Sequence, residues 1–278
     1  MEINWLQSIL LGCISGLTDI LPVSAQAHRL VLLKLFGING EPVLLRLLIH
    51  LSTMFALYYC CRGQILRLTR AQKLVKIPKR RRKRPLDTKS LMDYSLLKTT
   101  LIPIILIFLF YQKISVIESN LIIVAGILFV NGLILYIPQF FPTSTKDSSY
   151  VTRIEGLLLG CGAALSTVPG ISCIGAVSSV GSVCGMDRKY TFNNALLMNI
   201  TVHIGLIVYD VLALMEAGIG GLSLGTVAAF ILAAFGTFAG VIVGINLLNK
   251  IISAIGYSIF AFYCWGAALF TFILSLTI

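Results

Sequence analysis

The chain has 278 residues, of which 57% are hydrophobic and 12% charged, and its mean hydropathy is +0.93. Soluble domains carry about 25% charged residues, so these values exclude a soluble globule, and they exclude a disordered or coiled-coil chain as well. The apolar runs are long and continuous rather than alternating, which argues against a β-barrel and predicts an all-α polytopic membrane protein with a single integral domain over residues 1–278.

The formal net charge of +11 is concentrated in one segment, because 12 of the 22 Lys and Arg residues lie between Arg62 and Lys89. A basic loop between apolar spans is typical of the cytoplasmic side of a membrane. We therefore expect the loop 62–92 to be cytoplasmic and to contact anionic lipids through residues 62–89. This distribution does not favour nucleic acid binding.

The first hydrophobic stretch, at 4–35, is too interrupted for an ordinary span. The interrupting residues are Asp19, Pro22, Ser24, Gln26 and His28. Backbone groups that a break frees at membrane depth must be buried in protein or line a wet cavity. We therefore expect two half-helices that form a re-entrant pair.

Six uninterrupted apolar stretches are long enough to cross a bilayer, which takes about 20 residues. The expected spans are 43–61, 94–112, 119–137, 190–210, 222–246 and 255–276. With the basic loop inside, this order of spans places both termini outside.

A second broken stretch, at 154–186, comes after the third span, and Pro169, Gly170, Ser172 and Gly175 interrupt it. It enters the membrane from the side opposite to the first. Both stretches run from a small residue, Leu and a polar residue into a Pro and a Ser. Paired interruptions in oppositely oriented halves point to a substrate site near the midplane. We therefore expect two inverted halves, at 1–137 and 154–278.

Half-helix N-termini carry unpaired N–H groups and the positive end of the helix dipole, and they bind phosphate above all other anions. The expected phosphate-binding residues are Ser24, His28, Gly170, Ser172 and Gly175. Asp19 is a candidate to hold a divalent cation, to orient His28 or to accept a proton. For His50 and His203, on otherwise apolar helices, hydrogen bonding between helices explains their presence at least as well as chemistry does.

Residues 15–28 read S-G-L-T-D-I-L-P-V-S-A-Q-A-H and residues 169–175 read P-G-I-S-C-I-G. The first segment resembles the motif E-G-L-T-E-F-L-P-[IV]-S-S-T-G-H of the undecaprenyl-diphosphate phosphatase family (the BacA/UppP type). The second resembles that family's motif P-G-x-S-R-S-G. The segments H-L-S-T at 50–53 and G-M-D-R at 185–188 resemble its H-L-G-T and G-L-S-R. The resemblance covers nearly the whole chain.

This resemblance implies six spanning helices plus two re-entrant helix pairs in inverted-topology repeats, in a bacterial plasma membrane. It implies removal of one phosphate from the C55 polyprenyl diphosphate carrier, which recycles the carrier for cell-wall polymer synthesis. Family members are also suspected of moving the lipid between leaflets. A homodimer is left open.

Departures from the motifs fall on catalytic positions: the first motif glutamate is Ser15, the second is Asp19, the proposed nucleophilic serine is Ala25 and the arginine is Cys173. A phosphatase must neutralise charge on the transferring phosphoryl group, and losing one electrostatic donor costs about 10²–10³ in rate. We therefore expect a protein that binds and translocates undecaprenyl phosphate or diphosphate, with phosphatase activity lost or weak.

The alternative is an active undecaprenyl-diphosphate phosphatase with a rearranged site. In that reading Asp19, Ser24 and His28 are catalytic, and Arg29 or Arg188 supplies the missing positive charge. Asp19 is then the candidate ligand for Mg²⁺ or Ca²⁺ as cofactor. A transporter of small anions is a third reading with less support.

Overall fold

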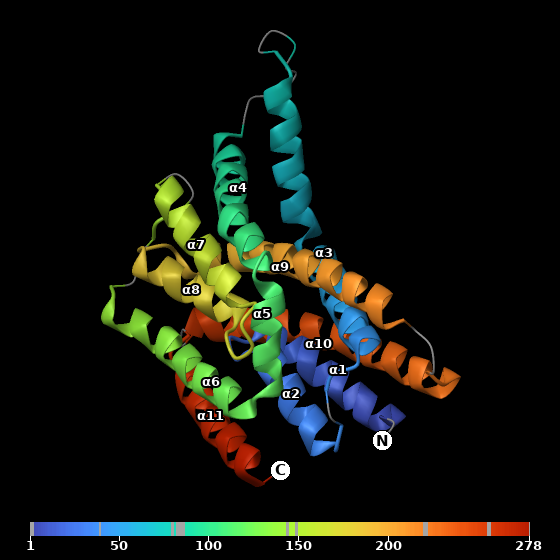
Figure 1. Ribbon diagram of the computed structural model, residues 1–278. Coiled ribbons are helices and arrows are strands. Elements are labelled where there is room, and N and C mark those ends of the chain that lie inside the picture. The colour runs from blue at the N-terminus through green and yellow to red at the C-terminus, as the bar shows by residue number, and fades with distance from the viewer. Residues whose placement is uncertain are drawn as a thin grey trace.

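Helices make up most of the chain (Figure 1), and the computed structural model describes residues 3–38, 40–78, 81, 87–142, 145–147, 150–218, 222–254 and 257–277. In chain order the α-helices are α1 Trp5–Ile20, α2 Ala25–Leu35, α3 Val43–Lys76, α4 Thr88–Phe108, α5 Tyr111–Ser115, α6 Leu121–Tyr136, α7 Arg153–Leu165, α8 Cys173–Val183, α9 Arg188–Ala217, α10 Leu224–Ala254 and α11 Ile259–Thr277. Two 3₁₀ turns, Val116–Ser119 and Ile137–Phe140, come after α5 and α6.

All six predicted spans are confirmed as helices long and apolar enough to cross a membrane. Their bounds are Val43–Lys76, Thr88–Phe108, Leu121–Phe140, Arg188–Ala217, Leu224–Ile252 and Ile259–Thr277. Large apolar side chains on these helices are exposed, among them Ile105 on α4 and Phe235 on α10. In water such exposure would be costly, so the structure is that of a multi-pass membrane protein.

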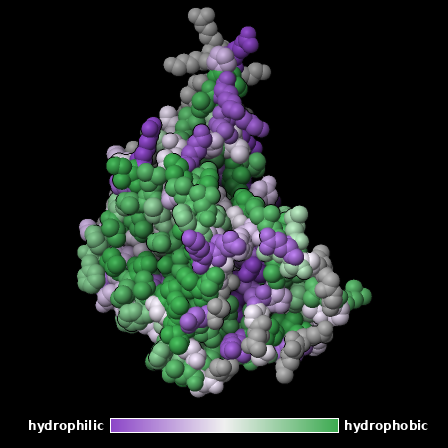
Figure 2. All heavy atoms as spheres, viewed as in Figure 1, coloured by the Kyte–Doolittle hydropathy of each residue, from purple (hydrophilic) through white to green (hydrophobic). Residues whose placement is uncertain are grey.

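One predicted boundary is wrong. Residues 62–76, expected to begin the basic loop 62–92, continue α3, whose 34 residues correspond to about 51 Å at 1.5 Å per residue. The segment is rich in Arg, Lys, Gln and Leu, which favour helix even where charge excludes them from lipid. Hydrophilic residues gather on this projecting end of α3 (Figure 2). Of the basic run 79–84, only Arg81 lies within the described residues.

The helix after this loop begins with a cap. Asp87 accepts a hydrogen bond from the backbone N–H of Ser90 (3.0 Å) and another from its hydroxyl. These bonds stabilise the charged carboxylate, and the side-chain bond from Ser90 is the main reason that the pKa of Asp87 lies below its usual value. The cap therefore fixes the residue at which α4 begins.

Both broken stretches form two short helices separated by a break. α1 ends at Ile20 because Leu21 precedes Pro22 and has extended backbone angles, which is the conformation that a subsequent proline favours. Ser24, the residue before α2, has φ +69°, a left-handed conformation that costs free energy outside glycine. In the second break, Gly170 takes a φ of +113° after Pro169. A positive φ thus marks both breaks, at a strained serine in the first and at a glycine, which adopts it readily, in the second.

The halves 1–137 and 154–278 pack into each other. α1 packs on α10 and α7 on α4, so the first helix of each broken pair contacts a spanning helix of the other half (Figure 1). α3 packs on α9 and α6 on α11. One buried apolar cluster, which includes Ile20, Leu135, Ile174 and Val241, joins both halves. This packing brings the two breaks together.

Candidate functional site

The two breaks are tied to each other by reciprocal hydrogen bonds. The N–H of Gly170 donates to Ser24 Oγ (3.1 Å), and Ser172 Oγ lies 3.4 Å from the carbonyl oxygen of Leu21, to which it donates. The N–H of Gly175 donates to Ser172 Oγ (3.2 Å) and begins α8. The structure therefore brings four of the predicted phosphate-binding residues together. Their polar groups form hydrogen bonds within and between the two breaks.

Asn131 on α6 adds a third tie, and it was not among the residues predicted from the sequence. Its Nδ2 donates to the carbonyl oxygen of Pro22 (3.2 Å), and its Oδ1 accepts from the N–H of Ser172 (3.0 Å). One fully buried amide thus satisfies backbone groups from both breaks. A lone Asn inside an apolar span was the signal that could have identified it.

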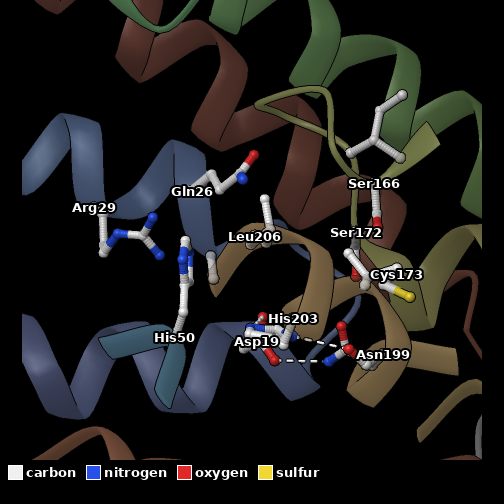
Figure 3. A pocket seen from close by; sticks show the side chains of 13 residues that line it. Asp19, Gln26, Arg29, His50, Ser166, Ser172, Cys173, Asn199, His203 and Leu206 are labelled. Carbon is white, nitrogen blue, oxygen red and sulfur yellow. Dashed lines mark hydrogen bonds and ion pairs between the residues drawn. The ribbon is translucent and has the colours of Figure 1, made fainter. Parts of the chain in front are cut away.

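A small polar pocket lies beside this junction, between α1, α2, α3, α9 and the second break (Figure 3). Among its lining residues are Asp19, Gln26, Arg29, His50, Asn199 and His203. These residues converge from four helices of an otherwise apolar membrane body. Ionisable side chains in such surroundings are expensive, and they mark functional sites.

One wall of the pocket is a fixed cluster of three polar residues. Asn199 Nδ2 donates to Asp19 Oδ2 (2.7 Å). His203 Nδ1 donates to the carbonyl oxygen of Asn199 (3.0 Å), and its Nε2 lies 3.7 Å from Asp19 Oδ1. Asp19 was predicted, whereas Asn199 was not. The cluster holds the Asp19 carboxylate in one orientation in the last turn of α1.

Asp19 lacks companions for a metal site made by the protein alone. Within the described ranges, no group of three or more His, Cys, Asp or Glu residues could hold a metal ion. One oxygen of the Asp19 carboxylate also accepts a hydrogen bond from Asn199. The residues present therefore do not fit a cage for Mg²⁺ or Ca²⁺, which need six or more oxygen ligands in all.

A second buried chain of polar groups lies behind His50. His50 Nδ1 donates to Asp210 Oδ2 (2.7 Å), and Arg46 Nε donates to Asp210 Oδ1 (2.7 Å). The side chains of His50 and Asp210 are 2% and 1% exposed. The chain joins α3 to α9 across 160 residues of sequence, and its acid was not among the predicted residues.

Arg29 is the only Lys or Arg among the described residues that line the pocket. It is buried, and it forms a two-pronged ion pair with Glu41, with Nε–Oε1 and Nη2–Oε2 distances of 2.6 and 3.3 Å. Its guanidinium points toward His50 (Figure 3). Arg188, the other predicted source of positive charge, does not line the pocket.

His28 lies on the other side of α2 from this pocket. Its Nδ1 donates to the carbonyl oxygen of Ser24 (2.7 Å), and its Nε2 is 2.8 Å from the Tyr263 hydroxyl, with the two rings stacked. Both residues border an apolar groove of about 730 Å³ between α1, α2 and α11. The structure therefore does not bring His28 together with Asp19.

A family model described as "Bacitracin resistance protein BacA" matches residues 8–270. The chain belongs to the BacA family. The proteins to which it is similar include an "Undecaprenyl-diphosphatase" of Methanobrevibacter smithii, 28% identical over 98% of each chain, and one of Carboxydothermus hydrogenoformans, 27% identical over 94% of each. An "Undecaprenyl-diphosphatase" of Renibacterium salmoninarum is 29% identical over 98% of this chain and 96% of its own.

The motif departures of this BacA-family chain lie at the pocket or next to it. Ala25 and Cys173 both line the pocket, so it has no hydroxyl at the one position and no fixed charge at the other. Ser15 is buried one turn before Asp19, and its hydroxyl has no hydrogen-bond partner among the described residues. The positive charge that lines the pocket comes instead from Arg29 on α2.

Proposed function

We propose that this chain is an undecaprenyl-diphosphate phosphatase with a rearranged site, which converts the C55 polyprenyl diphosphate into the monophosphate and inorganic phosphate. The polar pocket carries this proposal, since it places a guanidinium, a carboxylate and two imidazoles beside the two helix breaks in an apolar membrane body. The names of the relatives support this catalytic reading over the expected loss of activity.

In phosphoryl transfer the protein contributes little covalent chemistry. It accelerates the reaction mostly by positioning the reactants and by neutralising the charge on the transferring phosphoryl group. Arg29 brings a guanidinium to the pocket, and its two-pronged ion pair with Glu41 fixes the direction of that group. Asn199 and Asp19 hold the His203 ring against the pocket, so the polar groups are oriented before the substrate arrives. Arg29 thus takes the part that a motif arginine at Cys173 would play.

The proposal is tested by phosphate release from farnesyl diphosphate and undecaprenyl diphosphate, with purified protein in detergent. We expect release that saturates with substrate, with and without Mg²⁺ or Ca²⁺ compared side by side. Absence of release from both substrates under both conditions contradicts the proposal.

Binding and translocation of the lipid without hydrolysis is the second candidate, and Ala25 and Cys173 in the pocket favour it, because neither supplies charge or an oxygen. Saturable binding of undecaprenyl phosphate without phosphate release would support it. Movement of a labelled lipid between leaflets of proteoliposomes would then separate a transporter from a binder.

The same proposal includes a topology. The two broken pairs are re-entrant, and the two halves are inverted repeats. Both termini lie outside the cell. The segment 77–87 lies in the cytoplasm, where the basic residues around it contact anionic lipids. The reciprocal packing of α1 on α10 and α7 on α4 supports the repeats. We expect protease added outside intact cells to spare 77–87, and protease added to inverted vesicles to cut it. The reverse pattern contradicts this orientation.

A further inference from the structure

His50 is held in the way that an active-site imidazole is held. Its Nδ1–H donates to a buried carboxylate, Asp210, which is itself fixed by Arg46, with 2.7 Å in both contacts. Such an arrangement of base and orienting acid leaves Nε2 as the working nitrogen. His50 Nε2 makes no hydrogen bond to any other residue in the described part of the chain, and the ring lines the polar pocket.

The other two imidazoles are less suited to exchange a proton in this pocket. His203 has Nδ1 on the Asn199 carbonyl and Nε2 beside Asp19, and its ring meets His50 edge-on, with 5.4 Å between centroids. His28 has both nitrogens engaged at the apolar groove, by Ser24 and Tyr263. Among the three, His50 is the imidazole with a nitrogen left for a ligand.

A second observation points to a ligand in this pocket. Gln26 Oε1 is buried at the pocket and has no hydrogen-bond partner among the described residues. A buried acceptor without a donor is costly, which points to a donor such as water at this position. Arg29, on the same helix, points toward His50 (Figure 3). Gln26, Arg29 and His50 line the same pocket, so a hydrogen-bond donor at Gln26 and a phosphoryl group at Arg29 would share that pocket with His50.

We propose that His50 is the general base of the reaction, with Asp210 and Arg46 as its positioning residues; this rests on the proposed phosphatase function. His50 Nε2 accepts a proton from a water molecule as the water oxygen bonds to the terminal phosphorus. The bond from that phosphorus to the bridging oxygen breaks, and its electron pair leaves with the polyprenyl monophosphate. The proton then passes from Nε2 to the released phosphate. Asp210 stabilises the transient imidazolium.

The test is His50→Gln in the purified full-length protein, with farnesyl diphosphate as substrate. The glutamine amide can still donate to Asp210, so the buried pair is kept. General bases contribute about 10²–10⁴ in rate, so we expect kcat to fall by about that factor while KM changes little. The control is Asp93→Asn, a buried acid paired with Arg67 away from the pocket, which keeps the parent's kcat.

His28→Gln is measured beside it, because the sequence motif places its imidazole in the catalytic set. If His50→Gln turns over at the parent's rate while the parent is active, the base assignment is overturned and the phosphatase function stands. If His28→Gln alone is inactive, the base is His28. A parent without phosphate release overturns both the function and the assignment. A fall in affinity with unchanged kcat makes His50 a binding residue and also overturns the proposal.

Discussion

Gly16→Ala is expected to destabilise the protein and to inactivate it, although it adds one methyl group. A Cβ at Gly16 would lie 2.1 Å from the carbonyl oxygen of Thr237, and one at Gly12 would lie 2.0 Å from that of Ala233. Both obstacles are backbone atoms of α10, which cannot turn aside as a flexible side chain can. Small residues at such crossings let helix backbones approach closely, and packing replaces the hydrophobic effect in lipid.

Overpacking a well-filled interface costs about 1–3 kcal/mol, and more where backbone must move. Gly16 lies one turn before Asp19, so separating α1 from α10 also displaces a wall of the pocket. Unfolding in a denaturing detergent titration measures the loss, and phosphate release measures the displacement. Gly126→Ala on α6 is the matched control, because a Cβ there meets nothing within 4 Å. It should be neutral or stabilising by about 0.5–1 kcal/mol through helix propensity. Equal effects of the two substitutions would contradict the close-packed crossing.

Asp210→Ala is expected to cost about 3–5 kcal/mol, because it removes the carboxylate that pairs with the buried Arg46 and accepts a hydrogen bond from His50. The double substitution Arg46→Met with Asp210→Asn should recover most of this loss. It removes both charges, and the asparagine oxygen still accepts from His50. The free energy of unfolding of both variants, referred to the parent, checks the prediction.

Asp93→Ala supplies the comparison. Its partner Arg67 has a side chain that is 43% exposed and can return to water, so this loss should be the smaller one. A cost for Asp210→Ala no larger than that for Asp93→Ala, or no recovery in the double variant, would contradict a dry, charge-balanced pair.

The breaks and spans could be predicted because local chemistry decides them. Pro22 disfavours helical backbone angles at Leu21. An apolar run of about 20 residues is stable in the hydrocarbon core of the membrane. The end of α3 could not be located in this way, since hydropathy falls at the membrane surface while the helix continues into water. Hydropathy therefore locates the part of α3 that lies in lipid, and it carries no signal for where the helix ends.

Only part of the site could be predicted from the sequence, because local chemistry reveals some of its residues and tertiary packing decides the others. Asp19 is conspicuous in an apolar stretch, and it does line the pocket. The rotation of α2 decides which of its neighbours join it: Gln26 and Arg29 face the pocket, while His28, beside Arg29 in sequence, faces the groove. A helix turns by about 100° per residue, so the side chains of adjacent residues lie on different faces and contact different neighbours. His50 and Asp210 meet only through tertiary packing.

The central claim is that Arg29 supplies the positive charge for phosphoryl transfer in the pocket where the two breaks meet. The most direct measurement is the rate of phosphate release from undecaprenyl diphosphate by the double variant Arg29→Gln with Glu41→Gln, which keeps the formal charge balance. The control is Arg67→Gln with Asp93→Asn, an Arg–Asp ion pair outside the pocket whose arginine is more exposed than Arg29. We predict a loss of about 10²–10³ in kcat for the first variant and the parent's rate for the second. Release at the parent's rate by the Arg29 and Glu41 variant would contradict the claim.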